Sequence, residues 1–176
     1  MNNKNIFFIG FMGSGKTTVS AAFGKAYNRP VIELDDEIVS REGRTISQMF
    51  AESGEEYFRD WESRMLREIT AGNGTIVSCG GGIVIREENI RVMKQNGFIV
   101  LLKATPETTL ERVKNEKTRP ILNGHMNVEY IEQLMNKRAR AYQEAADVVV
   151  VTDGKSVDQV VRDVYESIHR AGQPSV

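Results

Sequence analysis

The fold of this chain is decided by a glycine-rich stretch near its start, Gly10-Phe11-Met12-Gly13-Ser14-Gly15-Lys16-Thr17. The stretch matches G-x-x-x-x-G-K-[ST] in full, follows an apolar run at residues 6–9 and precedes helical spacing at residues 16–27. A strand, such a loop and a helix in this order predict a phosphate-binding loop (P-loop), whose backbone N–H groups point at phosphate oxygens. The lysine then contacts the terminal phosphates of a nucleotide, and the threonine hydroxyl binds Mg²⁺. The alternative is a plain strand-to-helix turn with an exposed lysine.

The rest of the chain alternates short apolar runs with longer segments of helical spacing. Further strands are predicted at residues 31–34, 75–79, 98–102 and 148–151, and further helices at residues 55–71, 87–95, 106–114, 128–145 and 156–169. Near-continuous apolar strands between helices predict an α/β fold with a parallel sheet covered on both faces. Residues 36–52 read as a short helical insertion, and the polar residues 115–126 as a loop or lid. Because no repeat or linker divides the sequence, we predict one domain over residues 1–176.

The composition is that of an ordinary globular protein. The 176 residues carry 23 Lys and Arg against 24 Asp and Glu, a net charge of −1 that disfavours binding to nucleic acid by broad phosphate neutralisation. The single cysteine, Cys79, excludes an intramolecular disulfide, and with only two histidines a Cys/His zinc cluster is excluded as well. The sequence has no apolar run of membrane-spanning length and no recognisable signal peptide. We therefore expect a cytoplasmic protein without a membrane or nucleic-acid partner. The composition says nothing of oligomeric state, and a monomer is the simple expectation.

Three acids, Glu33, Asp35 and Asp36, follow each other closely at the end of the second predicted strand. Side chains alternate along a strand, so Glu33 and Asp35 are predicted to share one face and Asp36 to take the other. Ligands of open α/β sheets bind beyond the carboxyl ends of the strands. An acid there can act as a base toward a hydroxyl or hold a Mg²⁺-bound water. The same acids also suit a helix start with Asp35 or Asp36 as N-cap, and both roles stay open.

A run of three glycines, Gly80-Gly81-Gly82, ends the third predicted strand. Successive glycines let a ligand approach the backbone closely and leave N–H groups available to donate, although a simple flexible turn would look the same. Ser78 stands where many P-loop proteins place an Asp for Mg²⁺. Metal coordination would therefore depend on Thr17, water and the acids of the second strand.

Arginines in three separate segments are candidates for binding anions. Arg59 and Arg138 lie on predicted helices, and a planar guanidinium suits bidentate recognition of a carboxylate. The alternative is a solvated helix charge with a partner four residues away. Arg119 precedes Pro120, which favours an extended backbone in the predicted lid. An arginine on such a loop can stabilise charge during phosphoryl transfer.

Taken together, these motifs resemble those of the shikimate kinases. The matching pieces are residues 10–17, Asp35, Gly43-Arg44-Thr45-Ile46, Phe58-Arg59, Gly80-Gly81-Gly82, Arg119-Pro120-Ile121-Leu122 and Lys137-Arg138-Ala139. The resemblance implies a three-layer α/β/α fold with a five-stranded parallel sheet, of the nucleoside-monophosphate-kinase type. It also implies transfer of phosphate from ATP, with Mg²⁺, to the 3-hydroxyl of shikimate, on the way to chorismate and the aromatic amino acids.

The resemblance further implies a role for each matching residue. Asp35 would contact the shikimate hydroxyls and serve as base, with Lys16 and Arg119 as the other catalytic residues. The implied shikimate contacts are Asp35, Phe50, Phe58, Arg59, Gly80, Gly81, Gly82 and Arg138, within a substrate-binding region at about residues 36–72 and elsewhere. The implied ATP contacts are Gly13, Ser14, Gly15, Lys16, Thr17, Thr18, Arg112, Arg119 and Lys155, with a lid at about residues 112–126. The Asp-x-Asp of the family reads Glu33-Leu34-Asp35 here, so Thr17 would bind Mg²⁺ directly and Glu33, one methylene longer, through a water.

Other functions of P-loop proteins are weighed against this one. A GTPase is disfavoured because the sequence lacks the guanine motif Asn-Lys-x-Asp and the switch motif Asp-x-x-Gly. Another small-molecule kinase of the same fold, such as a gluconate kinase, also needs an arginine for a carboxylate and stays an alternative. A nucleotide-binding module without turnover is a third possibility, against which the joint presence of Lys16, Thr17, Asp35 and Arg119 speaks.

Overall fold

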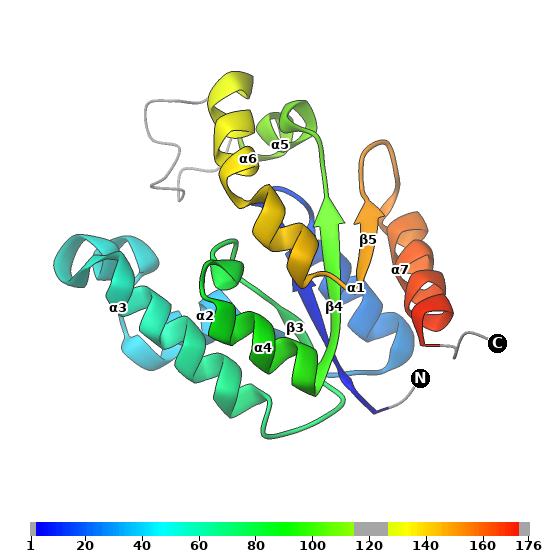
Figure 1. Ribbon diagram of the computed structural model, residues 1–176, viewed down its shortest axis with the longest axis horizontal. Helices are drawn as coiled ribbons and strands as arrows, with labels where there is room; N and C mark the ends of the chain where they lie inside the picture. Colours follow the sequence, from blue (N-terminus) through cyan, green and yellow to red (C-terminus); the bar gives the residue numbers. More distant parts are fainter. Residues whose placement is uncertain (1–2, 115–126, 173–176) are drawn as a thin grey trace.

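The computed structural model describes residues 3–114 and 127–172, and a single sheet organises them. Its strands are all parallel and stand in the order β2-β3-β1-β4-β5 (Figure 1). Their bounds are β1 (Asn5–Ile9), β2 (Val31–Glu33), β3 (Ile76–Ser78), β4 (Gly97–Lys103) and β5 (Val148–Val151). The predicted α/β class and the five-stranded parallel sheet are confirmed.

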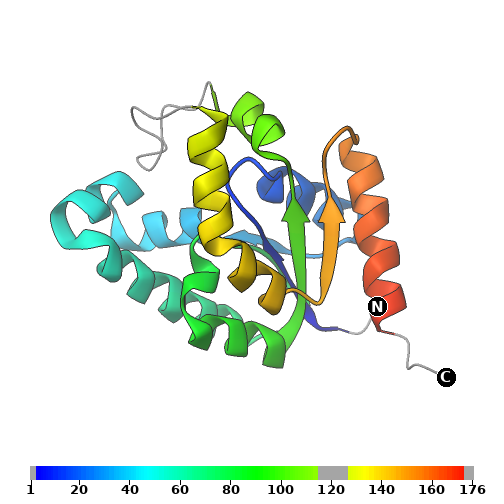
Figure 2. The same cartoon turned by 45° about the horizontal axis from the view of Figure 1, so that its top comes forward.

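Helices cover both faces of the sheet, which makes three layers (Figures 1 and 2). The helices are α1 (Lys16–Tyr27), α2 (Leu34–Glu42), α3 (Ile46–Ile69), α4 (Glu87–Asn96), α5 (Pro106–Val113), α6 (Val128–Ala145) and α7 (Val157–Ala171), with a 3₁₀ turn η1 (Ile83–Ile85). Alternation along the central strand explains the layers. Phe7 and Ile9 pack with residues of α2, α3, α4 and α6, whereas Ile6 and Phe8 pack with α1 and α7. Burial of apolar surface on both faces stabilises this arrangement.

The P-loop joins the central strand β1 to α1, as predicted. Gly15 is the N-cap of α1 with a φ of 93°, in the left-handed region that favours glycine. Gly13 has a φ of 71°, and a Cβ there would come within 2.9 Å of Val113 Cγ1 on α5. The two glycines therefore allow a backbone path and a close approach of α5 that other residues would oppose.

The second strand is shorter than predicted, and this changes the geometry of the acids. β2 ends at Glu33, and Asp35 and Asp36 lie in the first turn of α2. The prediction that strand alternation sets the directions of Asp35 and Asp36 is therefore wrong. The N-cap alternative is also wrong, because Glu33 occupies that position and its side chain makes no capping hydrogen bond. Carboxylates in the first turn still interact favourably with the helix dipole.

The predicted insertion at residues 36–52 consists of α2 and the first turns of α3. Thr45 caps α3 in a reciprocal capping box with Gln48, which explains why the helix starts earlier than the predicted residue 55. Gly54 interrupts the helix with a φ of 84° and a ψ of 168°, immediately before that predicted start. The predicted lid core at residues 115–126 lies outside the described residues, and so does Arg119. In the described ranges, no helix combines the length and apolar character needed to cross a bilayer.

Candidate active site

The predicted site residues gather beyond the carboxyl ends of the three strands β1, β2 and β3. The P-loop follows β1, Asp35 follows β2, and the glycine run follows β3. Helices α3 and α6 add Arg59 and Arg138 from more distant parts of the chain. Parallel strands bring these chain segments to one edge of the sheet, which is where α/β proteins bind ligands.

Lys16 is held against the backbone of its own loop. Its Nζ donates hydrogen bonds to the carbonyl oxygens of Gly10 at 2.8 Å and Phe11 at 3.0 Å. The ammonium group thus lies within the loop that is shaped to receive phosphate, and a bound phosphate would offer stronger, charged acceptors than these carbonyls. The geometry agrees with a lysine that contacts a nucleotide phosphate.

Glu33 lies beside Thr17, as the metal prediction requires. Thr17 Oγ1 donates to Glu33 Oε2 at 3.2 Å, and Ser20 Oγ donates to Glu33 Oε1 at 3.3 Å. Burial raises the pKa of the Glu33 carboxyl, while hydrogen bonds from Ser78, Thr17 and Ser20 act in the opposite direction. Glu33 also pairs with Ser78 in the register of β2 and β3. The cluster therefore joins carboxylate and hydroxyl oxygens, which are ligands of the kind that Mg²⁺ prefers.

The glycine run at the end of β3 occupies the centre of the site, and the space around it requires residues without a side chain. A Cβ at Gly80 would lie 2.5 Å from Asp35 Oδ1 and 2.8 Å from Glu62 Oε1. A Cβ at Gly82 would collide with the guanidinium of Arg59. The glycines thus let charged side chains from α2 and α3 approach the backbone, which is more than a flexible turn demands.

Arg59 is buried, with 4% of its surface exposed, so the solvated-charge alternative is wrong for it. Its Nη1 donates to Glu62 Oε2 at 2.5 Å, and its Nε and Nη2 donate to Glu55 Oε1 at 3.1 and 2.7 Å. The rings of Phe50 and Phe58 flank the guanidinium, with its Cζ 5.9 and 5.4 Å from the two ring centroids. Burial lowers the pKa of Arg59, but its ion pairs, first with Glu62 and then with Glu55, raise it overall. The site thus contains an arginine fork that already holds carboxylates.

Glu62 is a site residue that sequence reasoning missed. It is fully buried, and burial raises the pKa of its carboxyl to about 7 although Arg59 lowers it. Its Oε1 accepts no hydrogen bond within the described residues and faces the same space beside Gly80 as Asp35. The sequence did contain one signal for Glu62. It follows Arg59 by three residues on one helix, and this spacing puts both side chains on the same helix face.

Arg138 and Tyr142 reach the glycine run from α6. Arg138 Nη1 donates to the carbonyl oxygen of Gly81 at 3.0 Å, and the Tyr142 hydroxyl donates to the same oxygen at 2.6 Å. Burial raises the pKa of the Tyr142 hydroxyl to about 12, so it remains a donor at neutral pH. Tyr142 was not predicted, although its place four residues after Arg138 puts it on the same face of α6.

Of the two further predicted nucleotide contacts that the structure describes, Arg112 and Lys155, only Arg112 contacts the P-loop. Arg112 Nη1 donates to the carbonyl oxygen of Gly13 and to Thr152 Oγ1, each at 3.0 Å. Lys155 does not join them, because its Nζ pairs with Asp163 Oδ2 on α7 at 2.7 Å. The structure therefore brings Arg112 to the loop and leaves Lys155 on the surface of α7.

Comparisons with known proteins agree with this geometry. The family model described as shikimate kinase matches residues 12–169. A shikimate kinase from Dehalococcoides mccartyi is 37% identical over 166 residues, which cover 94% of this chain and 94% of that protein. The structure of shikimate kinase from Acinetobacter baumannii in complex with shikimate matches with a TM-score of 0.92 at 28% identity and covers 98% of this chain and 97% of that chain.

The gluconate kinase alternative finds no comparable support. A gluconokinase from Sinorhizobium meliloti matches with a TM-score of 0.57 at 16% identity, over 96% of this chain and 93% of that chain. Identity at this level shows a shared fold and carries nothing about the acceptor. The chain belongs to the shikimate kinase family, and its activity is the ATP-dependent phosphorylation of the shikimate 3-hydroxyl.

Proposed function

We propose that Asp35 is the base of this reaction and that the P-loop holds the donor. The bond between the shikimate 3-oxygen and the γ-phosphorus of ATP forms while the bond from that phosphorus to the β–γ bridging oxygen breaks. The proton of the hydroxyl passes to the Asp35 carboxylate, and the products are shikimate 3-phosphate and ADP. The support is the position of Asp35 in the first turn of α2, with its Oδ1 against the glycine run.

In this proposal Arg59 and Arg138 hold the shikimate carboxylate. The Glu55 carboxylate, whose side chain is 53% exposed, already occupies one edge of the Arg59 guanidinium and so serves as a stand-in for a substrate carboxylate. Shikimate would displace Glu55, while the buried Glu62 keeps the other edge of the fork oriented. Phe50 and Phe58 would form the apolar wall beside the ring of the substrate.

On the donor side, backbone N–H groups from Gly13 to Thr18 would bind the phosphates. Lys16 would exchange its two carbonyl acceptors for phosphate oxygens, where it stabilises charge that develops on the transferred group. Arg112 would lie beside the nucleotide because it contacts the Gly13 carbonyl. The proposed roles of Arg119 on the phosphates and of Lys155 at the adenine rest on the family resemblance.

The chain also offers a fitting place for Mg²⁺. The Thr17 hydroxyl would hold the ion, and Glu33 would hold one of its waters, because the two side chains are in contact with each other. When bound with ATP, Mg²⁺ neutralises charge on the terminal phosphates. In the part of the chain that the structure describes, no group of three or more His, Cys, Asp or Glu is placed to hold a metal ion.

The observation that carries the proposal is the convergence of Asp35, Arg59 and Arg138 on one glycine run. The test is steady-state turnover with ATP, MgCl₂ and each of three acceptors: shikimate, an analogue without the carboxylate, and gluconate. We expect shikimate 3-phosphate by ³¹P NMR. The kcat/KM should be lower by at least about 100-fold for the analogue, which offers no carboxylate to Arg59 and Arg138, and for gluconate, which has the carboxylate but an open chain in place of the shikimate ring. Equal turnover of the analogue without the carboxylate would overturn the assignment of the arginines, and equal turnover of gluconate would overturn shikimate as the preferred acceptor.

We also propose that the chain works as a monomer in the cytoplasm. The single cysteine is buried between the strands and α3, and burial raises its pKa, so it takes no part in disulfide chemistry. The site residues described here all come from one chain, so no second copy is needed to complete the site. Light scattering coupled to gel filtration is expected to give the mass of one chain, 19.8 kDa, and a mass of about twice that value would overturn the proposal.

A further inference from the structure

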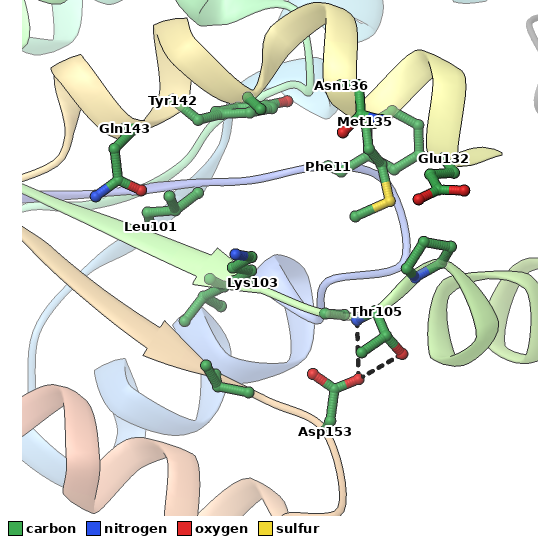
Figure 3. A pocket seen from close by; sticks show the side chains of 15 residues that line it. Phe11, Leu101, Lys103, Thr105, Glu132, Met135, Asn136, Tyr142, Gln143 and Asp153 are labelled. Atoms are coloured by element: carbon green, nitrogen blue, oxygen red, sulfur yellow. Dashed lines mark hydrogen bonds between the residues drawn. The ribbon is translucent and has the colours of Figure 1, made fainter.

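A second hollow lies between α6 and the β4–β5 edge of the sheet, behind the P-loop (Figure 3). Its volume is about 410 Å³, within the range of pockets that bind small molecules. Met135 and Tyr142 of α6 line one side, Leu101 and Val151 line the sheet side, and Phe11 of the P-loop reaches in from one end. The walls are thus largely apolar and aromatic, with polar groups from Thr105, Asn136 and Gln143 and charged groups from Lys103, Glu132 and Asp153.

This pocket is distinct from the active site. Its lining includes none of Lys16, Thr17, Asp35, Arg59 and Arg138. Two of its lining residues, Phe11 and Tyr142, nevertheless contact residues of the active site. The carbonyl of Phe11 accepts a hydrogen bond from Lys16, and the hydroxyl of Tyr142 donates to the Gly81 carbonyl.

We propose that this pocket is a binding site for a small, neutral aromatic molecule, and that its occupant strengthens shikimate binding through Tyr142. The apolar walls favour an aromatic ring, which can stack on Tyr142 and contact the sulfur of Met135. The charged lining residues Lys103 and Glu132 are exposed, and the Asp153 carboxylate already accepts from the Thr105 N–H and hydroxyl at 2.9 and 3.0 Å. An ionised group deep in the pocket would therefore lose hydration without a buried counter-charge.

The link to the active site is the phenol of Tyr142. The ring faces the pocket, while its hydroxyl and Arg138 share the Gly81 carbonyl as acceptor. A ligand stacked on the ring would add contacts that favour the ring position in which the Tyr142 hydroxyl holds the Gly81 carbonyl. If shikimate binds the glycine run in this same arrangement, the two ligands favour one state of the chain, which gives positive coupling.

Indole is the probe for the binding test, which uses calorimetric titration of the full chain. We expect a Kd of about 1 mM or tighter, as for a fragment of this size. Val151→Phe should fill the pocket and weaken indole binding at least tenfold. Val149→Phe is the matched control, because Val149 and Val151 lie on the same face of β5 and are 40% and 45% exposed, but only Val151 lines the pocket. It should leave the Kd within about twofold.

The coupling is tested by titrating shikimate with and without saturating indole. We expect the shikimate Kd to fall at least twofold in the unmodified chain and to stay unchanged in Tyr142→Phe, which keeps the ring but lacks the hydroxyl. Any one of three results would overturn the site. They are absence of indole binding up to 10-fold above about 1 mM, binding of indole by Val151→Phe as tight as by the unmodified chain, and tighter binding of indole-3-acetate or tryptamine than of indole. An indole effect that persists in Tyr142→Phe, or no effect at all, would overturn the coupling. None of these outcomes depends on turnover, so they are separate from failure of the proposed catalytic roles.

Discussion

The donor half and the acceptor half of the active site are built in opposite ways. The proposed donor half is a continuous stretch, residues 10–17, in which Lys16 is held against the backbone of its own loop. The acceptor half assembles Asp35 from α2, Arg59 and Glu62 from α3, and Arg138 from α6 around the glycine run. The first half is therefore determined by local geometry and the second by tertiary packing.

This difference has an energetic consequence. In the proposed donor half, the P-loop would bind phosphate with N–H dipoles that cost little to orient, because the turn and the helix start already point them inward. The acceptor half keeps several charges out of water, and these charges must compensate one another in the folded chain, as Arg59 and Glu62 do. We therefore expect substitutions in the acceptor half to alter charge balance and stability as well as catalysis.

The largest effect should come from Asp35→Asn, which removes the proposed proton acceptor from the acceptor half. The amide keeps the shape but cannot accept the proton, and a general base contributes about 10²–10⁴-fold. Turnover at saturating shikimate should fall by that factor, with the KM for ATP unaltered. The control is Asp36→Asn, an exposed neighbour in the same helical turn. A loss confined to the KM for shikimate would mean that Asp35 only positions the substrate.

Lys16→Met tests the donor half, because it removes the ammonium group from the P-loop. Removing a charge that stabilises the transferring group should lower kcat by about 10²–10³-fold, with shikimate affinity unchanged. Lys25→Met, on the exposed face of the same helix, should match the unmodified enzyme. Calorimetric titration with shikimate and steady-state kinetics separate the two quantities. Undiminished kcat in Lys16→Met would contradict the assignment of the P-loop lysine.

Glu62→Gln tests the charge balance of the acceptor half. Glu62 has a pKa of about 7 when folded, against 4.5 in the unfolded chain, so between these values the folded chain binds more protons. The contribution of Glu62 to the free energy of unfolding is therefore largest below pH 4.5 and declines as pH rises to 7, by about 3 kcal/mol at most.

Urea denaturation from pH 4.5 to 8 measures this contribution. The free energy of unfolding of the unmodified chain, minus that of Glu62→Gln, should fall across the window. Glu56→Gln removes an exposed carboxylate from the same helix, and should keep the pH dependence of the unmodified chain. A difference that stays constant between pH 4.5 and 7 would contradict the raised pKa.

Arg59→Lys and Arg138→Lys test the proposed carboxylate grip. Each keeps the charge but loses the planar fork, and a hydrogen bond to a charged group contributes roughly 1.5–3 kcal/mol. Each should raise the Kd for shikimate at least about tenfold. The loss of binding free energy in the double variant should be smaller than the sum of the two single losses, because both arginines act on one carboxylate. Arg140→Lys, two residues from Arg138 and 90% exposed, is the control. Unchanged shikimate affinity in both single variants would make these arginines structural.

The smallest effect is expected from Glu55→Gln, which tests whether the Glu55 carboxylate competes with substrate for the Arg59 guanidinium. Glu55 is 53% exposed although Arg59 is buried, and an ion pair with an exposed partner is worth about 0.2–1 kcal/mol, so removing this competitor should lower the Kd for shikimate by about 1.4- to fivefold. Glu52→Gln, whose carboxylate pairs with Arg44 instead, should leave the Kd as it is. Weaker shikimate binding in Glu55→Gln would show that Glu55 supports Arg59 rather than competing with substrate.

Sequence reasoning was most accurate where structure depends on neighbours along the chain. The start of α1 after the P-loop, the bounds of α6 and the bounds of β5 agree with prediction. The end of β2 was placed one residue too late, because an apolar Leu34 continues the strand pattern although it begins α2. The predicted helix start at residue 55 coincides with the break at Gly54, whereas the first turns of α3, which begin at the Thr45 capping box, were predicted as part of the insertion at residues 36–52.

The chain by itself determined the P-loop, the strand–helix alternation and the arginines that suit a carboxylate, since these depend on residue type and local spacing. Helical spacing pairs Arg59 with Glu55 and Glu62, but only the tertiary structure decided which of these side chains are buried and which distant groups Arg138 contacts. It placed Arg59 between a buried and an exposed glutamate, and it joined Arg138 and Tyr142 to Gly81, 57 and 61 residues away along the chain. Such contacts depend on which helix packs over which strand end. The burial that results is what shifts the pKa of Glu62, and no local pattern contains that information.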